Sequence, residues 1–426
     1  MNKINKIKLS ALVVTSVISS TSYSAGFGLI EQSVTGLGRA FAGGAAVADD
    51  ASTIYYNPAG LTNLKHPELD IGLNFLAAKI EFTDSGSTSA FAAPLTGGDD
   101  GDVANNAFLP NLYYSTPLND RLHVGIGITT PFGLATEYDD SWKGRYHAVK
   151  SDLRTININP TIAFKATDKV SVGFGVNLQK IDLELTQMAD LGGLGGPAFS
   201  QKADGKVNIE ADDWSWGYNL GLMLQATEST RLGLAYRSKV SHTLKGNATL
   251  RTATGALAAD ENIMGNVDLP ESLSLAVHHQ FNTKWAVMGG ATWTRWSRFK
   301  ELAIISDGPL LSSTKQENWD DSMRYSLGVS YQYNDKWTLR SGIAFDETPI
   351  PSAQLRTARL PGEERTWLSL GASYKYSEKM TIDTGYMHVF VRTADINENN
   401  GSNYVLNGKY DVSSHIFGVQ MRWLLL

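Results

Sequence analysis

Residues 169–179 read Lys-Val-Ser-Val-Gly-Phe-Gly-Val-Asn-Leu-Gln, with a large apolar side chain at every second position. Successive side chains of a β-strand point to opposite faces, so this stretch would have one apolar face and one face of small and polar residues. The same alternation returns at 124–128, 156–164, 273–281, 325–333 and 417–423. The sequence therefore predicts an all-β fold built from many such strands.

The connections between these runs alternate between short and long. Short turn signals include Thr167-Asp168 and Asn334-Asp335, whereas the stretches 84–102 and 136–151 are long and polar. Counted from Glu68, there are about fourteen strand-like runs, and an even number with tight turns at one end and long loops at the other is typical of outer-membrane barrels. We therefore expect a fourteen-stranded antiparallel transmembrane β-barrel.

The polar faces of the runs argue against a soluble β-sandwich. A sandwich would expose these faces to water and would enrich them in Lys and Glu. Here they carry mostly Gly, Ser, Asn, Thr and Gln, which suits a crowded, wet barrel interior. Aromatic residues also gather at strand ends, as in the interfacial girdles of membrane barrels. They are Trp285, Trp293, Tyr331, Tyr333, Trp337, Tyr374, Tyr376 and Trp423.

The first 24 residues have the pattern of a secretory signal peptide. Lys3, Lys6 and Lys8 precede an apolar stretch at 9–18, and small residues stand just before Ala25. That apolar stretch is far shorter than the roughly 20 residues of a membrane-spanning helix. We expect export, removal of residues 1–24, and insertion as a multi-pass barrel into the outer membrane of a Gram-negative bacterium.

Composition excludes several classes of function. The chain has no cysteine, which excludes disulfides and thiolate metal sites, and it carries 37 Lys and Arg against 43 Asp and Glu, a formal charge of −6. Such a mild charge does not indicate a nucleic-acid partner. The eight histidines occur in neither a Gly-x-Ser-x-Gly nor a His-Glu-x-x-His motif. We expect no catalytic residues, no metal and no cofactor.

Residues 25–66 do not follow the strand pattern. Glycines and the turn Asn57-Pro58 punctuate short stretches of helix-compatible composition. A barrel of about fourteen strands encloses more space than its side chains fill, so this segment would serve as a partly helical hatch inside the barrel of residues 67–426. Gly36-x-Gly38 is a poor nucleotide-binding loop because no strand precedes it.

Several motifs together resemble the long-chain fatty acid outer-membrane transporter family, which is related to aromatic-hydrocarbon channels. They are Ala25–Phe27, Gly36–Ala40, Ala48–Ala51, Asn57-Pro58-Ala59, Gly133–Glu137, Trp293–Ser297, Gly342–Asp346 and Arg365 with Trp367–Ser369. The resemblance implies a monomeric, hatch-plugged barrel that carries long-chain fatty acids by passive diffusion. The alternative ligands are other hydrophobic compounds, such as aromatic hydrocarbons. An open porin or an adhesin would lack the hatch.

An acyl ligand needs apolar surface for its chain and a cation for its carboxylate. Arg324, Arg340 and Arg365 fall on the polar face of their strands, where each would bind that headgroup or pair with barrel Asp and Glu. By resemblance, Lys315 matches a lysine of the family's internal high-affinity site. Gln187 stands where the family has a second basic residue.

Two motifs bear on ligand movement. The run that ends in Thr130-Pro131-Phe132-Gly133 carries a proline and a glycine, which weaken strand pairing and predict a kink. By resemblance, ligand leaves sideways into the bilayer at this kink. The resemblance also assigns Asn57, Pro58 and Ala59 to a hatch motif that rearranges when ligand binds.

The long loop after the fifth run is unusually apolar. Met188, Leu191, Leu194 and Phe199 stand among its glycines, and an exposed apolar loop is costly unless it is used. By resemblance, such residues form an outer hydrophobic groove that first captures ligand. The remaining partners that we expect are outer-membrane lipid and lipopolysaccharide. The acidic stretch 99–102 would hold a bridging divalent ion or form a solvated loop tip.

Overall fold

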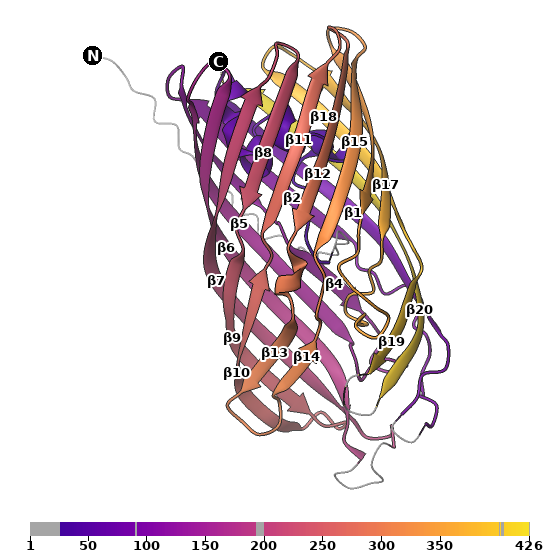
Figure 1. Ribbon diagram of the computed structural model, residues 1–426. Helices are drawn as coiled ribbons and strands as arrows, with labels where there is room; N and C mark the ends of the chain where they lie inside the picture. Colours follow the sequence, from indigo (N-terminus) through magenta and orange to yellow (C-terminus); the bar gives the residue numbers. More distant parts are fainter. Residues whose placement is uncertain (1–25, 90–91, 193–199, 400, 402–403, 426) are drawn as a thin grey trace, which may run out of the picture.

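A computed structural model describes residues 26–89, 92–192, 200–399, 401 and 404–425. Three short α-helices and a 3₁₀ turn come first, and strands fill most of the remainder (Figure 1). The helical segments are α1 (Val34–Leu37), α2 (Gly44–Val47), α3 (Thr53–Tyr56), η1 (Pro58–Asn63) and η3 (Trp296–Arg298). The strands are β1 (Glu68–Asp84), β2 (Ala107–Pro117), β3 (Leu122–Thr129), β4 (Gly133–Glu137), β5 (Lys150–Lys165), β6 (Val170–Asp190), β7 (Asp204–Gln225), β8 (Thr230–Arg237), β9 (Val240–Arg251), β10 (Leu257–Leu269), β11 (Ser272–Gln280), β12 (Trp285–Thr294), β13 (Glu301–Ser306), β14 (Ser313–Gln316), β15 (Ser322–Gln332), β16 (Trp337–Asp346), β17 (Arg365–Lys375), β18 (Met380–Val391), β19 (Ala394–Asn399) and β20 (Val405–Leu424).

The twenty strand segments form one closed antiparallel barrel. Six pairs of consecutive segments are the two halves of one interrupted strand, namely β3 with β4, β8 with β9, β10 with β11, β12 with β13, β14 with β15 and β18 with β19. The barrel closes because β1 pairs with β20 over the whole of its length. The predicted fourteen-stranded antiparallel barrel is therefore confirmed for the described residues.

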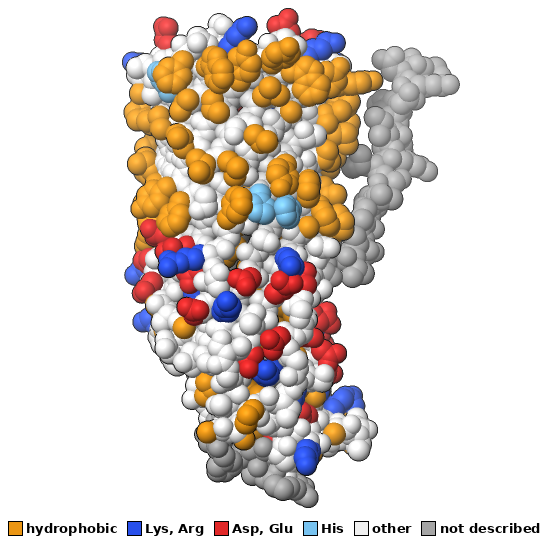
Figure 2. Space-filling model, turned by 90° about the vertical axis from the view of Figure 1, so that its right-hand side faces the viewer, with side chains coloured by type: hydrophobic (Ala, Val, Ile, Leu, Met, Phe, Trp, Pro, Cys, Tyr) orange, Lys and Arg blue, Asp and Glu red, His pale blue; other side chains and the backbone are white. Residues whose placement is uncertain are grey.

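An apolar belt surrounds the half of the barrel that carries the short turns, and charged side chains gather beyond it (Figure 2). Along β6, the outward-facing Phe174 and Leu178 are each 44% exposed. The next outward residues on the same face are Lys180, Asp182 and Glu184. The belt therefore ends near Leu178, and β6 continues beyond it toward the long loops.

Aromatic residues mark both rims of the belt. At the short-turn rim, Trp285 stacks near Tyr331 at 4.3 Å between ring centroids, and Trp337 lies 4.7 Å from Tyr374. Trp216, which is 68% exposed, lies on the outer face of β7 near the opposite rim. Such girdles anchor a barrel between the two membrane interfaces. No helix among the described residues is long and apolar enough to cross a membrane.

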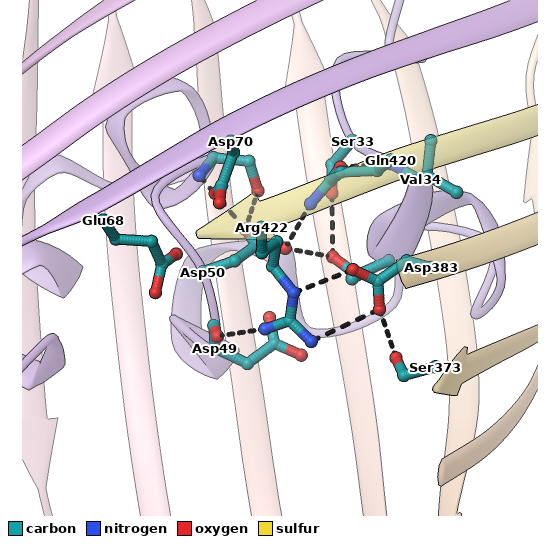
Figure 3. Close-up of polar contacts among 12 residues, drawn as sticks. Ser33, Val34, Asp49, Asp50, Glu68, Asp70, Ser373, Asp383, Gln420 and Arg422 are labelled. Atoms are coloured by element: carbon teal, nitrogen blue, oxygen red, sulfur yellow. Dashed lines mark hydrogen bonds and ion pairs between the residues drawn. The ribbon is translucent and has the colours of Figure 1, made fainter. Parts of the chain in front are cut away.

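Residues 26–64, here called the hatch, lie inside the short-turn half of the barrel (Figure 1). A buried polar network ties them to the wall (Figure 3). Arg422 of β20 donates to Asp383 of β18 at 2.7 Å and to the carbonyl of Asp49 at 3.1 Å. The backbone N–H of Ala51 donates to carboxylate oxygens of Glu68 and Asp70, each at 2.8 Å. The hatch is therefore held from several strands at once.

Candidate functional site

The inner face of the barrel changes character beyond the belt. Along β6, the inward residues Asn177 and Gln179 are followed by Ile181, Leu183 and Leu185, all of them buried. Apolar side chains of β5, β7, β9, β10 and β13 join them in one cluster, here called the chamber. It contains Leu153, Ile209, Ala211, Val240, Leu244, Ala248, Leu250, Ile263, Val267, Leu269 and Ile304. Strands with charged outer and apolar inner faces thus bring together an apolar surface of the kind that suits an apolar ligand.

An aromatic cage closes the chamber on the hatch side. Phe27 lies 4.9 Å from Trp296, 5.6 Å from Phe299 and 6.0 Å from Trp319, measured between ring centroids. Trp296 and Phe299 come from the break between β12 and β13, and Trp319 from the break between β14 and β15. The strand interruptions therefore turn aromatic side chains inward around a residue of the hatch.

A buried charged cluster adjoins the cage. The ammonium of Lys315 lies 2.9 Å from a carboxylate oxygen of Glu398. Glu398 also accepts a hydrogen bond from the N–H of Ala358 at 2.9 Å and lies 3.4 Å from His147 Nδ1. Glu317 follows β14, and its Oε2 accepts from Trp319 Nε1 at 3.1 Å. Because Trp319 belongs to the cage, the charges and the apolar chamber form one continuous site.

A second cation in this cluster comes from Arg359, in the stretch between β16 and β17. Its guanidinium donates to Gln187 Oε1 at 2.9 Å, Ser151 Oγ at 3.0 Å and the carbonyl of Lys150 at 3.0 Å. Burial lowers the pKa of Arg359 to about 10, against the attraction of Glu398 and Glu317. Arg359 therefore stays charged at neutral pH and brings a positive charge to Gln187.

The other three predicted cations lie nearer the hatch. Arg324 lines a cavity of about 140 Å³ together with Tyr55 and Tyr56, and donates to Thr292 Oγ1 at 3.2 Å. Arg340 lies 3.8 Å from Asp49 and 3.9 Å from Asp383. Arg365 stands opposite Asp346 on the neighbouring strand, at 3.8 Å. The structure thus separates these arginines from Lys315 and surrounds two of them with carboxylates.

The hatch meets the predicted kink directly. β3 and β4 are separated by residues 130–132, and both pair with β5. The N–H of Leu29 donates to the Pro131 carbonyl at 2.7 Å, and the N–H of Gly133 donates to the Phe27 carbonyl at 3.0 Å. On the outer side, β2 pairs with β3 only from Leu112 to Pro117. Residues 107–111 of β2 therefore have a ladder partner on β1 alone among the described strands.

The side chain of Gln32 strengthens this junction. Its amide nitrogen donates to the carbonyl of Thr130 at 2.9 Å, and its amide oxygen accepts from the N–H of Thr130 at 3.2 Å. Residues 27–32 of the hatch therefore cover the interrupted wall from the inside.

The hatch motif docks on β6 and β7, which follow β5 around the barrel from the kink. Asn57 caps η1 through the N–H of Ala59 at 3.1 Å and donates to the carbonyl of Leu222 in β7 at 3.1 Å. Pro58 begins η1, where its missing N–H costs nothing. A Cβ at Gly173 of β6 would come within 2.3 Å of the Ala59 nitrogen, so the close approach requires glycine there.

The predicted loop residues are only partly described. Met188 donates its backbone N–H to the carbonyl of Arg145 at 2.8 Å and packs beside Leu95, Tyr146 and Tyr404. Leu191 packs against the chamber. Leu194 and Phe199 lie outside the described residues.

Sequence reasoning missed Phe27 as a cage residue, and it missed His147, Glu317, Arg359 and Glu398. No spacing in the chain links these positions, because they come from the hatch, three connections and β19. The signal in the sequence that could have indicated this cluster is the pair of opposite charges Lys315 and Glu317, which stand two residues apart in one strand-like run. The described residues contain no group of three or more His, Asp or Glu side chains placed to bind a metal ion.

Comparisons with known proteins agree with this architecture. Residues 15–424 match the family described as outer membrane protein transport protein (OMPP1/FadL/TodX). A long-chain fatty acid transport protein of Salmonella typhi is 32% identical over 414 residues, which cover 92% of this chain and 93% of that protein. A Pseudomonas aeruginosa FadL homologue of known structure is 26% identical, with a TM-score of 0.88 over 94% of this chain and 100% of its own.

A more distant structure shares the fold. The Ralstonia pickettii toluene transporter TbuX is 22% identical, with a TM-score of 0.68 over 94% of this chain and 99% of its own. The family consists of transport proteins of the outer membrane, and its members are not enzymes. This chain belongs to the OMPP1/FadL/TodX family of outer membrane transport proteins.

Proposed function

We propose that this protein carries long-chain fatty acids across the outer membrane by passive diffusion. The chamber, which ends at the Lys315 and Arg359 cluster, carries this proposal. Each methylene buried there gains about 0.8 kcal/mol over water, and the two cations offer charge-assisted hydrogen bonds to a carboxylate. The named fatty acid transporters among the relatives support the same ligand class.

The headgroup would bind by exchange. Lys315 is paired with Glu398, so an incoming carboxylate takes the place of Glu398 on the ammonium. Gln187 on strand β6 is neutral, and Arg359, which donates a hydrogen bond to it, supplies the second positive charge there. The departing Glu398 keeps His147 and the N–H of Ala358 as partners.

Entry of the acyl chain would move the hatch. The chain needs the space that Phe27 fills in the cage, and residues 27–29 also pair with residues 131–133. Displacing Phe27 therefore weakens the contacts that cover the kink. Ligand then leaves sideways into the bilayer between β2 and the kink, where the ladder is already interrupted.

Capture would begin in the outer loops. Leu191 already packs on the chamber, and Met188 lies in a small apolar cluster nearby. We assign them to an outer groove that passes ligand inward. The rearrangement of Asn57, Pro58 and Ala59 is a later step, because this motif is held to β7 by a hydrogen bond of its own.

Uncharged aromatic hydrocarbons are the second candidate ligands. Lys315 and Arg359 both have protein partners, Glu398 and Gln187 respectively. A neutral ligand would leave these partners in place and use only the chamber and the cage. The two ligand classes therefore differ in their need for the charged cluster.

Binding to the detergent-purified protein separates the two classes. We expect a labelled long-chain fatty acid to bind wild type, and Lys315→Ala and Arg359→Ala each to weaken it about tenfold or more, since one charge-assisted contact is lost. Lys245→Ala, on the exposed outer part of β9, is the matched control and should bind like wild type. The corresponding fatty alcohol should bind all four proteins similarly. Equal binding of the acid to every variant would favour the hydrocarbon alternative.

A further inference from the structure

Glu317 is a buried carboxyl without a counterion. Glu317 is only 5% exposed, and its carboxyl accepts a hydrogen bond from the indole N–H of Trp319 at 3.1 Å. Among the described residues, no Lys, Arg or His nitrogen lies within 4.0 Å of it in an ion pair. The charged groups around it are Lys315 on β14, Glu398 on β19 and Arg359 between β16 and β17, with His147 behind Glu398.

The two carboxyls of this cluster have different surroundings. Glu398 faces the ammonium of Lys315, the N–H of Ala358 and the ring of His147, and is held as a carboxylate. Glu317 is desolvated and lies near the negative charge of Glu398. A buried carboxyl without a counterion takes up a proton because burying the ion costs more.

Electrostatics agree with this geometry. Burial, and then the charge of Glu398, raise the pKa of Glu317 to about 8, while Lys315, Arg359 and the Trp319 hydrogen bond act in the opposite direction. At neutral pH Glu317 is then a carboxylic acid with one O–H to donate. It stands between the cage and the cations, where the carboxylate of an acyl ligand would lie.

We propose that Glu317 donates a hydrogen bond to the carboxylate of the ligand as a neutral acid, and that acid binding is therefore linked to one proton. This inference rests on the proposed function. The direction of the pH dependence follows from the hydrogen bond between Glu317 and the carboxylate of the ligand. Below the pKa of Glu317 the O–H stabilises the bound carboxylate, and above it two negative charges share the site and repel.

The test measures the dissociation constant of a labelled fatty acid between pH 7 and pH 9. Wild type should bind about tenfold more weakly at pH 9 than at pH 7, because a group with a pKa near 8 is then mostly ionised. Glu317→Gln, which keeps a donor but cannot ionise, should show the same dissociation constant at both pH values. Glu378→Gln, on an exposed short turn, is the control and should keep the wild-type profile.

A second variant tests the same role of Glu317 if Glu317→Gln folds poorly. Trp319→Phe removes the hydrogen bond that lowers the pKa of Glu317, so the pH at which acid binding weakens should rise. The fatty alcohol should bind independently of pH. Acid binding that does not change between pH 7 and pH 9, or a wild-type profile in Glu317→Gln, would overturn the role of Glu317. A failure of the acid to bind wild type at pH 7 would instead overturn the proposed function.

Discussion

Arg422 joins the hatch to two strands of the barrel wall. Its guanidinium reaches Asp383 on the neighbouring strand and the backbone of Asp49 in the hatch. Asp383 is 1% exposed at its side chain, so it would remain as a buried charge with little compensation if Arg422 were removed. The distant Arg340, at 3.9 Å, would be its remaining ion pair among the described residues.

We therefore expect Arg422→Ala to destabilise the protein by about 3–5 kcal/mol, the usual cost of removing one partner of a buried ion pair. Urea-induced unfolding followed by gel mobility would measure it. Arg392→Ala is the matched control, because Arg392 is 74% exposed and pairs only loosely with Glu364 at 3.4 Å. A loss in Arg422→Ala no larger than in the control would contradict this role.

At the scale of elements, the reversal of polarity along single strands creates the site. β6 keeps one alternation from Val172 to Leu185, but over that stretch its outer face changes from apolar to charged and its inner face from polar to apolar. The change coincides with the edge of the apolar belt near Leu178. One uninterrupted strand therefore presents an apolar face to the outside in one half and to the inside in the other, and the inner face is the one that we propose binds ligand.

The junction between the hatch and the kink is the second important element. Gly28 and Phe132 are antiparallel bridge partners, and the backbone of residues 27–29 runs beside residues 131–133. The proposed site of lateral exit and the residue that fills the cage are thus joined within a few residues. Moving one of them requires moving the other.

A cross-link at this junction tests the coupling. The chain has no native cysteine, and bridge partners lie close enough for a disulfide, so Gly28→Cys combined with Phe132→Cys should lock the hatch to the kink. We expect fatty acid uptake in the oxidised double variant to fall to background and to recover on reduction. Each single variant, treated identically, is the control. Uptake that persists in the fully cross-linked protein would exclude movement of residues 27–29 as a step of transport.

At the scale of the whole molecule, the barrel could be predicted from sequence because its signal is local and repeated. The alternation around Phe174 indicates a strand from its own residues, and Asn334-Asp335 indicates a turn in the same way. The resemblance located Lys315 and the kink at Pro131. Arg359 and Glu398 could not be found, because only closure of the barrel brings a connection and β19 beside Lys315.

Whether Arg340 and Arg365 could bind a headgroup also could not be predicted from their own strands. Their inward direction followed from the alternation, but their carboxylate neighbours are on the hatch and on adjacent strands. Only Arg324, of these three, lines the cavity at the hatch. Parity along a strand predicts which way a side chain points, and not what it meets.

We propose above all that an amphiphile lies in the chamber with its carboxylate at Lys315. A fatty acid with a photoreactive group at its methyl end tests this most directly, after cross-linking to the purified protein and peptide mapping by mass spectrometry. We predict labels on chamber residues such as Ile181, Leu244 and Ile304, and their loss in Lys315→Ala. Labels confined to belt residues such as Phe174 and Leu275, unchanged in Lys315→Ala, would contradict the account.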